Sequence, residues 1–311
     1  MSKKHILLLG GTGFVGRRLV AALHQSGYKV SVISRSLRPG IFPAAVDHFA
    51  CSLEHKLTLN QLLPSVDIVI HMASASTPST STHNPTFEIL HNVIPTTQFL
   101  EAFAEHHTPL LIYLSSGGAI YGNHQSEKAS EQHVVTPLSY YGAGKASIES
   151  LLHAFCHQTK RNAIVLRPSN LYGPDQPERT GFGIIPTLIA KALRNEPIDI
   201  WGDGNTTRDY LYIDDFIELL CKIIDSNSYI DGCNIFNAGT GNGTTVNDLC
   251  KKIESISGVT FIRNYHPIRA VDVQRIVLDT EKTKATYNWT AKTSLNVGLK
   301  ETWQTATGEN T

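Results

Sequence analysis

The protein has 311 residues, 41% of them hydrophobic, and its 27 basic residues balance 27 acidic ones. That length accommodates one large α/β domain or two smaller units, and the composition excludes fibrous and disordered classes. Because the formal net charge is zero, no overall field would attract nucleic acid or an anionic membrane surface. We therefore expect neither as a partner, and any bound anion must be held locally.

The cysteines and histidines follow no pattern of a disulfide framework or a metal site. Five cysteines are scattered without a CxxC pair, and fourteen histidines lack ligand spacing. We expect reduced thiols, a cytoplasmic location and no metal. The lysines before "ILLL" resemble a signal peptide, but the short apolar run and the glycines after it favour a buried first strand. No apolar run approaches the ~20 residues of a membrane helix.

In chain order, short apolar runs alternate with longer amphipathic segments. Nearly continuous hydrophobicity is typical of strands buried on both faces of a parallel sheet. The alternation predicts an α/β fold with a doubly wound parallel sheet of the Rossmann type. The expected strands are 5–10, 29–34, 47–50, 67–73, 110–116 and 163–168, and the expected helices are 14–26, 57–63, 85–105 and 140–160.

The texture changes after residue 168, where proline and glycine become frequent before a helix expected at 184–195. A strand that continues into a helix is expected over 209–224. We predict a dinucleotide-binding domain of residues 1–168 with a return at 209–236. Residues 169–208 and 237–311 would form a smaller α+β substrate-binding lobe, and the cleft between the two would hold the ligand.

A glycine-rich turn follows the first expected strand and opens the first helix. Gly10, Gly13 and Gly16 lie in "LLLGGTGFVGRRLV", together with Phe14 and Val15. Glycines permit a tight turn and a close backbone approach to a pyrophosphate, and the helix N-terminus offers unpaired N–H groups. This context predicts dinucleotide binding at these five residues.

The end of the second expected strand carries Ser34 and Arg35. Enzymes that use NAD usually have an acidic residue there, which accepts from the ribose hydroxyls. A hydroxyl and a guanidinium can instead pair with a 2′-phosphate, which favours NADP. Alternatively, Arg35 stacks on the adenine or points to water.

The segment "PLSYYGAGKASIE" raises the question of why glycines interrupt a helix. Glycine costs about 0.5–1 kcal/mol relative to alanine in a helix, yet Gly142 and Gly144 both lie here. Residues four apart share a helical face, which pairs Tyr141 with Lys145. A nearby ammonium, together with an oxidised nicotinamide, would lower the pKa of the phenol by about three units and make it a base. Alternatively, Tyr141 packs in the core and Lys145 reaches solvent.

Together these motifs resemble the extended short-chain dehydrogenases/reductases that act on nucleotide sugars, the NAD-dependent epimerase/dehydratase family, with UDP-galactose 4-epimerases as the closest type. The resemblance covers nearly the whole chain. It rests on "GGTGFVG", "HMA" at 71–73, "HNVIPT" at 91–96, "YLSSGGAIYG" at 113–122, "YGAGK" at 141–145, "LRPSNLYGP" at 166–174, "WGDGNTTRDYLYIDD" at 201–215 and "NAGTGNGTTVNDL" at 237–249.

The resemblance implies that Tyr141 transfers the proton and that Lys145 lowers its pKa and holds the nicotinamide ribose. It also implies a serine or threonine that contacts the reacting sugar hydroxyl. This chain departs from the pattern, because Gly117 occupies the usual position of that hydroxyl. Ser116 is the nearest substitute, followed by Ser115.

For the ligands, the resemblance places Ala73, Asn92 and Pro168 near the cofactor, while Ser52 replaces an aspartate usual near the adenine. On the substrate, a UDP-sugar or another nucleotide sugar, it implies Asn170 as a contact and Arg208 as a phosphate-binding residue. It further implies Arg269 and Asp272, which would clamp the diphosphate and accept from ribose hydroxyls.

The reaction implied is 4-epimerisation through a transient 4-keto sugar, with NAD as the cofactor of the family type. Dehydration is disfavoured, because Gly117, Gly118 and Ala119 provide no acid or base. The alternatives are an NADPH-dependent 4-ketoreductase, which Ser34 and Arg35 favour, and a dinucleotide-sensing regulator without catalysis. The resemblance also implies a homodimer formed through the helices near 90–105 and 140–160.

Overall fold

The computed structural model describes residues 3–78, 80–82, 84–123, 127–178, 183–226, 229–269 and 271–309. At its centre lies a seven-stranded sheet in the order β10-β6-β5-β4-β1-β2-β3, in which every neighbouring pair is parallel. The strands are β1 (His5–Leu9), β2 (Lys29–Ser34), β3 (Asp47–Ala50), β4 (Ile68–His71), β5 (Leu110–Leu114), β6 (Asn162–Pro168) and β10 (Cys233–Ala238).

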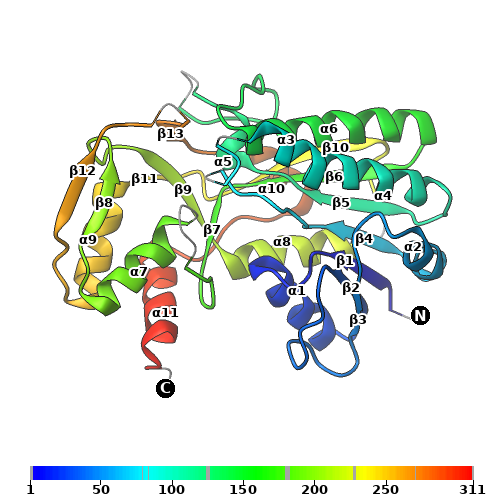
Figure 1. Ribbon diagram of the computed structural model, residues 1–311, viewed down its shortest axis with the longest axis horizontal. Coiled ribbons are helices and arrows are strands. Elements are labelled where there is room, and N and C mark those ends of the chain that lie inside the picture. The colour runs from blue at the N-terminus through cyan, green and yellow to red at the C-terminus, as the bar shows by residue number, and fades with distance from the viewer. Residues whose placement is uncertain are drawn as a thin grey trace.

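Helices cover both faces of this sheet (Figure 1). On one face, α1 (Phe14–Gln25) and α8 (Ile213–Asp225) share a hydrophobic core with alternate residues of the strands. On the other face, the corresponding core includes α2 (Lys56–Leu62), α4 (Ile94–Ala104) and α6 (Tyr140–Thr159). The α/β doubly wound fold expected from the apolar runs is therefore confirmed.

A second group of elements lies beyond the carboxyl ends of the strands, at the left of Figure 1. It contains a four-stranded sheet of β7 (Asn170–Tyr172), β9 (Thr207–Tyr212), β11 (Gly243–Thr245) and β13 (Arg275–Ile276). A two-stranded sheet pairs β8 (Ile198–Trp201) with β12 (Arg263–His266). The helices α7 (Ile184–Arg194), α9 (Val246–Ser257) and α11 (Leu295–Thr307) pack on these strands around a separate hydrophobic cluster.

The single helix expected over 85–105 is interrupted in the structure. It consists of α3 (Pro85–Glu88), a π-helical turn at Ile89–Val93, and α4. Pro95 has no N–H and its ring opposes a regular preceding turn, so a wide turn just before it relieves the conflict. The short α5 (Gly117–Ile120) follows β5 and places Ser116 just before its first residue.

The chain returns to the large sheet through β10, as the sequence indicates for 209–236, whereas β9 belongs to the second sheet. The late helix α10 (Glu281–Tyr287) and Trp289 pack on the core of the large sheet. The division into residues 1–168 plus 209–236 and 169–208 plus 237–311 stays a prediction. Within the described residues, no helix is both long enough and apolar enough to cross a membrane.

Candidate active site

One cavity of about 1010 Å³ lies where the carboxyl ends of the parallel strands face the second group of elements. In doubly wound sheets this edge is where ligands bind. All of the site residues expected from the sequence line this cavity. They are Gly10, Gly13, Phe14, Val15, Gly16, Ser34, Arg35, Ala73, Asn92, Ser116, Tyr141, Lys145, Pro168, Asn170, Arg208, Arg269 and Asp272.

The glycine-rich turn forms a cradle whose shape suits a pyrophosphate. Gly10 adopts φ +84°, and a Cβ there would lie 2.7 Å from the backbone of Ala73. A Cβ at Gly13, which precedes α1, would lie 3.6 Å from the Gly10 carbonyl oxygen, an ordinary contact, and this N-cap position provides no side-chain cap to the helix. The first N–H groups of α1 therefore point into the cavity without a side-chain partner, which fits the diphosphate of a dinucleotide.

At the adenosine end of the cradle, Ser34 is engaged within the protein. Its Oγ donates to the Ser36 carbonyl at 2.9 Å and lies 2.7 Å from His48 Nε2. Arg35 is exposed, and Arg38 joins it along the cavity wall. The guanidiniums are thus better placed than the Ser34 hydroxyl to meet a 2′-phosphate.

Tyr141 and Lys145 lie one turn apart at the start of α6. Ser139 is the N-cap of this helix, and its side chain accepts a hydrogen bond from the Gly142 N–H. Lys145 is only 5% exposed, so the alternative in which it reaches solvent is wrong. Its Nζ donates to the Leu114 carbonyl at 2.8 Å and lies 5.8 Å from the centre of the Tyr141 ring. The ammonium is therefore fixed between β5 and the phenol.

The protein groups alone do not make Tyr141 acidic. Burial raises its pKa to about 12, a hydrogen bond with the Ser116 side chain lowers it, and the charge of Glu88 raises it. Burial likewise lowers the pKa of Lys145 to about 8, against the attraction of Glu88 and Glu149. Burial therefore dominates the pKa of Tyr141 in the protein alone, and the expected lowering by Lys145 together with an oxidised nicotinamide stays a prediction.

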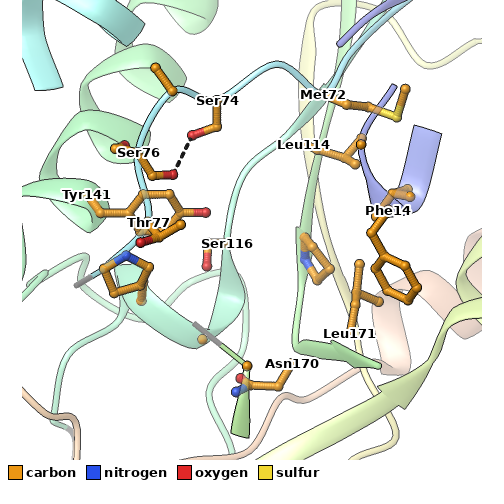
Figure 2. Close-up of a pocket in the computed structure, with 18 of the residues that line it drawn as sticks. Phe14, Met72, Ser74, Ser76, Thr77, Leu114, Ser116, Tyr141, Asn170 and Leu171 are labelled. Atoms are coloured by element: carbon orange, nitrogen blue, oxygen red, sulfur yellow. Dashed lines mark hydrogen bonds between the residues drawn. The ribbon is translucent and has the colours of Figure 1, made fainter. Parts of the chain in front are cut away.

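Of the two serines considered beside Tyr141, Ser116 is the one that acts on the phenol. Its side chain lowers the pKa of Tyr141, and Figure 2 shows the two side chains on the same side of the cavity. Ser115 is also buried, but among the residues that the structure describes its Oγ has no hydrogen-bond partner. At Gly117, a Cβ would lie 2.6 Å from Leu278 Cδ1 and 2.9 Å from the Arg167 carbonyl oxygen, so the position expected to carry a hydroxyl is sterically closed.

At the substrate end, Arg208 is largely desolvated. Its Nη1 donates to the Thr207 carbonyl at 3.0 Å, and burial lowers its pKa. A buried guanidinium is stabilised by an anion, which agrees with the expected phosphate contact. Arg269 instead forms a two-point ion pair with Asp272, at 2.8 and 3.0 Å, and lies over the Trp201 ring at 4.6 Å. These two expected substrate residues are therefore paired with each other.

Sequence reasoning missed the loop that follows β4, the residues Ser74 to Thr77, which forms one wall of the cavity (Figure 2). Asn92 holds this loop, since its Oδ1 accepts from the Ala75 N–H at 2.7 Å and its Nδ2 donates to Ser76 Oγ at 2.9 Å. The available signal was the serine-rich run directly after a strand. Glu88, behind this wall, was also missed.

Among the described residues, no group of three or more histidine, cysteine, aspartate or glutamate side chains could hold a metal ion. The polar groups in the cavity are mainly hydroxyls, amides and cations, which suit a sugar and phosphates, and the lining also includes the carboxylates of Glu54, Glu178, Asp199 and Asp272. The hydroxyls and cations in this cavity can transfer protons and form hydrogen bonds to a bound ligand.

Comparison with known proteins gives the same picture. A UDP-glucose 4-epimerase of Mycolicibacterium smegmatis is 28% identical over 306 residues, covering 95% of this chain and 96% of that protein. A Thermotoga maritima UDP-glucose 4-epimerase solved with UDP-glucose is 32% identical, with TM-score 0.91 over 98% of this chain and 99% of that one. A Thermus thermophilus UDP-glucose 4-epimerase solved with NAD is 27% identical, with TM-score 0.90 over 98% and 99%.

The family model "NAD dependent epimerase/dehydratase family" matches residues 6–239, which span the glycine-rich cradle, the Tyr141 and Lys145 pair and the return strand β10. The match covers most of the chain, and the relatives align along nearly its whole length. The chain therefore belongs to the NAD-dependent epimerase/dehydratase family.

Proposed function

We propose that this protein is a nucleotide-sugar 4-epimerase that acts on a UDP-sugar through a transient 4-keto sugar. The observation that carries the proposal is the placement of Tyr141 beside Ser116 and one helical turn from the buried Lys145, in the same cavity as the dinucleotide cradle. Relatives that align along the whole chain are UDP-glucose 4-epimerases, which supports UDP as the nucleotide.

In this mechanism Tyr141 takes the proton of the sugar 4-hydroxyl and returns it when the opposite epimer forms. The C4–H bond would break at the same time, and NAD, when bound, would supply the acceptor for this hydride and return it. Ser116 donates a hydrogen bond to the reacting oxygen, and Lys145 favours the phenolate through its charge. The positive charge of the oxidised ring adds to that of Lys145 and offsets the burial that raises the pKa of Tyr141 to about 12.

We assign the cradle around Gly10, Gly13 and Gly16 to the pyrophosphate, and Lys145 to the nicotinamide ribose. NAD is the resident cofactor in this proposal, because the solved relatives hold NAD. The exposed Arg35 and Arg38 lie where a 2′-phosphate would extend, so NADP should also be accepted.

On the substrate, Arg208 would bind the diphosphate and Asn170 the sugar. The paired Arg269 and Asp272 present a flat guanidinium above Trp201 at the outer rim, where a ribose or a base would lie. The second group of elements would thus act as the substrate lobe of residues 169–208 and 237–311.

The test is an assay of purified protein with UDP-glucose, UDP-galactose and their N-acetyl forms. An epimerase interconverts one of these pairs without net consumption of added cofactor. Net NADPH oxidation with a nucleotide 4-keto sugar would instead identify the 4-ketoreductase. Binding of cofactor with neither activity would identify a sensor. Tyr141→Phe should fold normally and lose at least about a hundredfold in kcat, and near-normal turnover would overturn the assignment.

We further propose a homodimer and a cytoplasmic protein. The side chains of Ile89, Leu90, Ile94 and Leu151 are exposed around α4 and α6, where the family resemblance expects the dimer contact. All five cysteines are unpaired, which suits a reducing compartment. Light scattering of Leu151→Glu against the unaltered protein tests the dimer, because a charge in the interface should yield monomers.

A further inference from the structure

A carboxylate lies buried behind the wall of the active site. Glu88 is 2% exposed at the junction of α3 with the π-helical turn. Its Oε2 accepts from Ser76 Oγ at 2.5 Å and its Oε1 accepts from Asn92 Nδ2 at 2.9 Å, while Asn92 also donates to Ser76. Glu88 is therefore held by the same residues that shape the loop along the cavity. A buried carboxylate without a role is costly, so its presence needs an explanation.

Glu88 also explains the glycine that interrupts α6. A Cβ at Gly144 would lie 2.4 Å from Glu88 Oε1, 2.5 Å from its Cγ and 2.8 Å from its Cδ. Any side chain at residue 144 would therefore collide with the carboxyl group. Glycine at residue 144 destabilises the helix, but it leaves room for the Glu88 carboxylate to pack against the segment that carries Tyr141 and Lys145.

The charged and titratable groups around this carboxylate come from four elements. On α6 they are Lys145, which attracts it, and Tyr141, whose phenolate it repels. Glu149 on α6 also attracts Lys145, and Tyr113 on β5 is buried beneath the ammonium. His71 on β4 is kept neutral by burial with help from Lys145, and His91 on the π-helical turn is exposed. Lys145 is the positive charge that interacts with Glu88, Glu149 and His71.

We propose that Glu88 is a positioning residue of the active site, a buried counter-ion that keeps Lys145 charged and, with Asn92 and Ser76, fixes the wall of the cavity beside Tyr141. This inference rests on the proposed function, which gives Lys145 and Tyr141 their roles. Burial alone would drive Lys145 toward its neutral form. The negative charge of Glu88 opposes that loss, so that the lysine remains able to stabilise a phenolate.

The direct test follows the titration of Lys145 by NMR of protein labelled at the lysine Cε, with the resonance assigned through Lys145→Met. The unaltered protein should titrate at a pKa of about 8. Glu88→Gln should move that titration to lower pH by at least about half a unit, because the attracting charge is gone. Glu101→Gln, an exposed carboxylate on α4, is the matched control and should leave it unchanged.

Packing and charge are separated by a second pair of variants. Gly144→Ala should be destabilised, because its Cβ meets the carboxyl group, whereas Glu88→Ala with Gly144→Ala removes every Glu88 atom in that collision. The double variant should be more stable than Gly144→Ala. Its Lys145 should still titrate at a lower pH than in the unaltered protein, as in Glu88→Gln. Glu88→Asp keeps the charge and should titrate close to the unaltered protein. If the double variant restores the original titration, the role is packing and the proposal is overturned.

In the assay, Glu88→Gln should move both limbs of the pH profile of kcat to lower pH, with KM nearly constant. The acid limb moves because Tyr141 loses a repelling charge, and the alkaline limb moves because Lys145 deprotonates earlier. An NMR titration unchanged in Glu88→Gln overturns the inference whatever the assay shows. If the titration shifts but the protein has no epimerase activity, the electrostatic interaction between Glu88 and Lys145 is supported and the proposed function is refuted.

Discussion

Arg167 and Glu149 form a two-point ion pair between β6 and α6, with Nη2–Oε2 at 2.5 Å and Nε–Oε1 at 3.0 Å, and both side chains are less than about a tenth exposed. Arg167 also donates to the Tyr121 hydroxyl at 2.8 Å. Glu149 lies one turn beyond Lys145, so this pair fixes the helix that carries the proposed catalytic residues. The attachment of α6 to the sheet is thus electrostatic as well as apolar.

Breaking this pair should be costly. Glu149→Gln leaves a buried guanidinium without its counter-charge, and we expect a loss of about 3–5 kcal/mol in the free energy of unfolding, measured by urea denaturation. The exposed pair of Arg194 and Glu178 provides the comparison. Glu178→Gln should cost less than about 1 kcal/mol. Equal effects of the two substitutions would contradict the importance given to the buried pair.

Ser116→Ala and Ser115→Ala separate the two serines beside Tyr141. The Ser116 side chain lowers the pKa of the phenol, whereas the Ser115 hydroxyl has no hydrogen-bond partner among the described residues. We expect Ser116→Ala to lower kcat about 10- to 100-fold, and Ser115→Ala to change it less than about threefold. Steady-state kinetics with the sugar nucleotide that the protein epimerises measures both. A larger loss at Ser115 would transfer the role to that residue.

Gly117→Ser should not restore the hydroxyl at the position where the family resemblance expects it. The new Cβ would lie 2.6 Å from Leu278 Cδ1, and the overpacking should cost about 1–3 kcal/mol of stability. Pairing it with Leu278→Ala should give a loss smaller than the sum of the two single losses, because the collision is relieved. Thermal denaturation of the three variants tests this, and strict additivity would show that the collision does not occur.

His71 should make the protein sensitive to acid. Burial, aided by Lys145, lowers its pKa to about 3, and its Nε2 lies 3.0 Å from Thr96 Oγ1. Between about pH 6.5 and pH 3 the unfolded state binds a proton at this histidine and the folded state does not. The free energy of unfolding therefore falls as the pH is lowered through this range, by up to about 1.4 kcal/mol per pH unit. Urea denaturation at several pH values should show a shallower decline for His71→Gln. Parallel curves would remove His71 as a cause.

Arg35→Ala tests the cofactor end of the cavity. If Arg35 pairs with a 2′-phosphate, the substitution weakens NADP binding about tenfold and leaves NAD binding nearly unchanged. Thermal stability measured against each dinucleotide reports both affinities, since a ligand at 100 times its Kd stabilises by about 2.7 kcal/mol. A matched loss for both cofactors would favour stacking of Arg35 on the adenine.

The sequence was sufficient for the large sheet because parallel strands buried on both faces are written as apolar runs, such as the "ILLL" of β1. It also placed the expected site residues at one edge, because the carboxyl ends of parallel strands meet there. The burial of Glu88 could not be predicted from the sequence, since a glutamate in a helical segment ordinarily faces solvent. The misfit at Gly144 was visible, but only the fold brings the two residues together.

Two other features of the site were not predicted from the sequence. The raised pKa of Tyr141 follows from burial, which no spacing of residues discloses. The pairing of Arg269 with Asp272 was accessible in principle, because residues three apart can meet, but motif resemblance directed both toward the substrate. A resemblance to a family identifies which residues belong to a site more readily than it identifies the side chains with which they pair.

The π-helical turn at Ile89–Val93 has a consequence for changes in chain length. Each residue of a helix advances the facing direction by about 100°, and the wide turn absorbs one extra residue. Glu88, just before the turn, and Asn92, within it, are hydrogen-bonded to the loop beside the site, while Phe99 and Phe103, after the turn, pack in the core against the sheet. Deleting one residue here would yield a more regular helix that rotates one set of side chains out of place, so this segment should reject deletions that an ordinary surface helix tolerates.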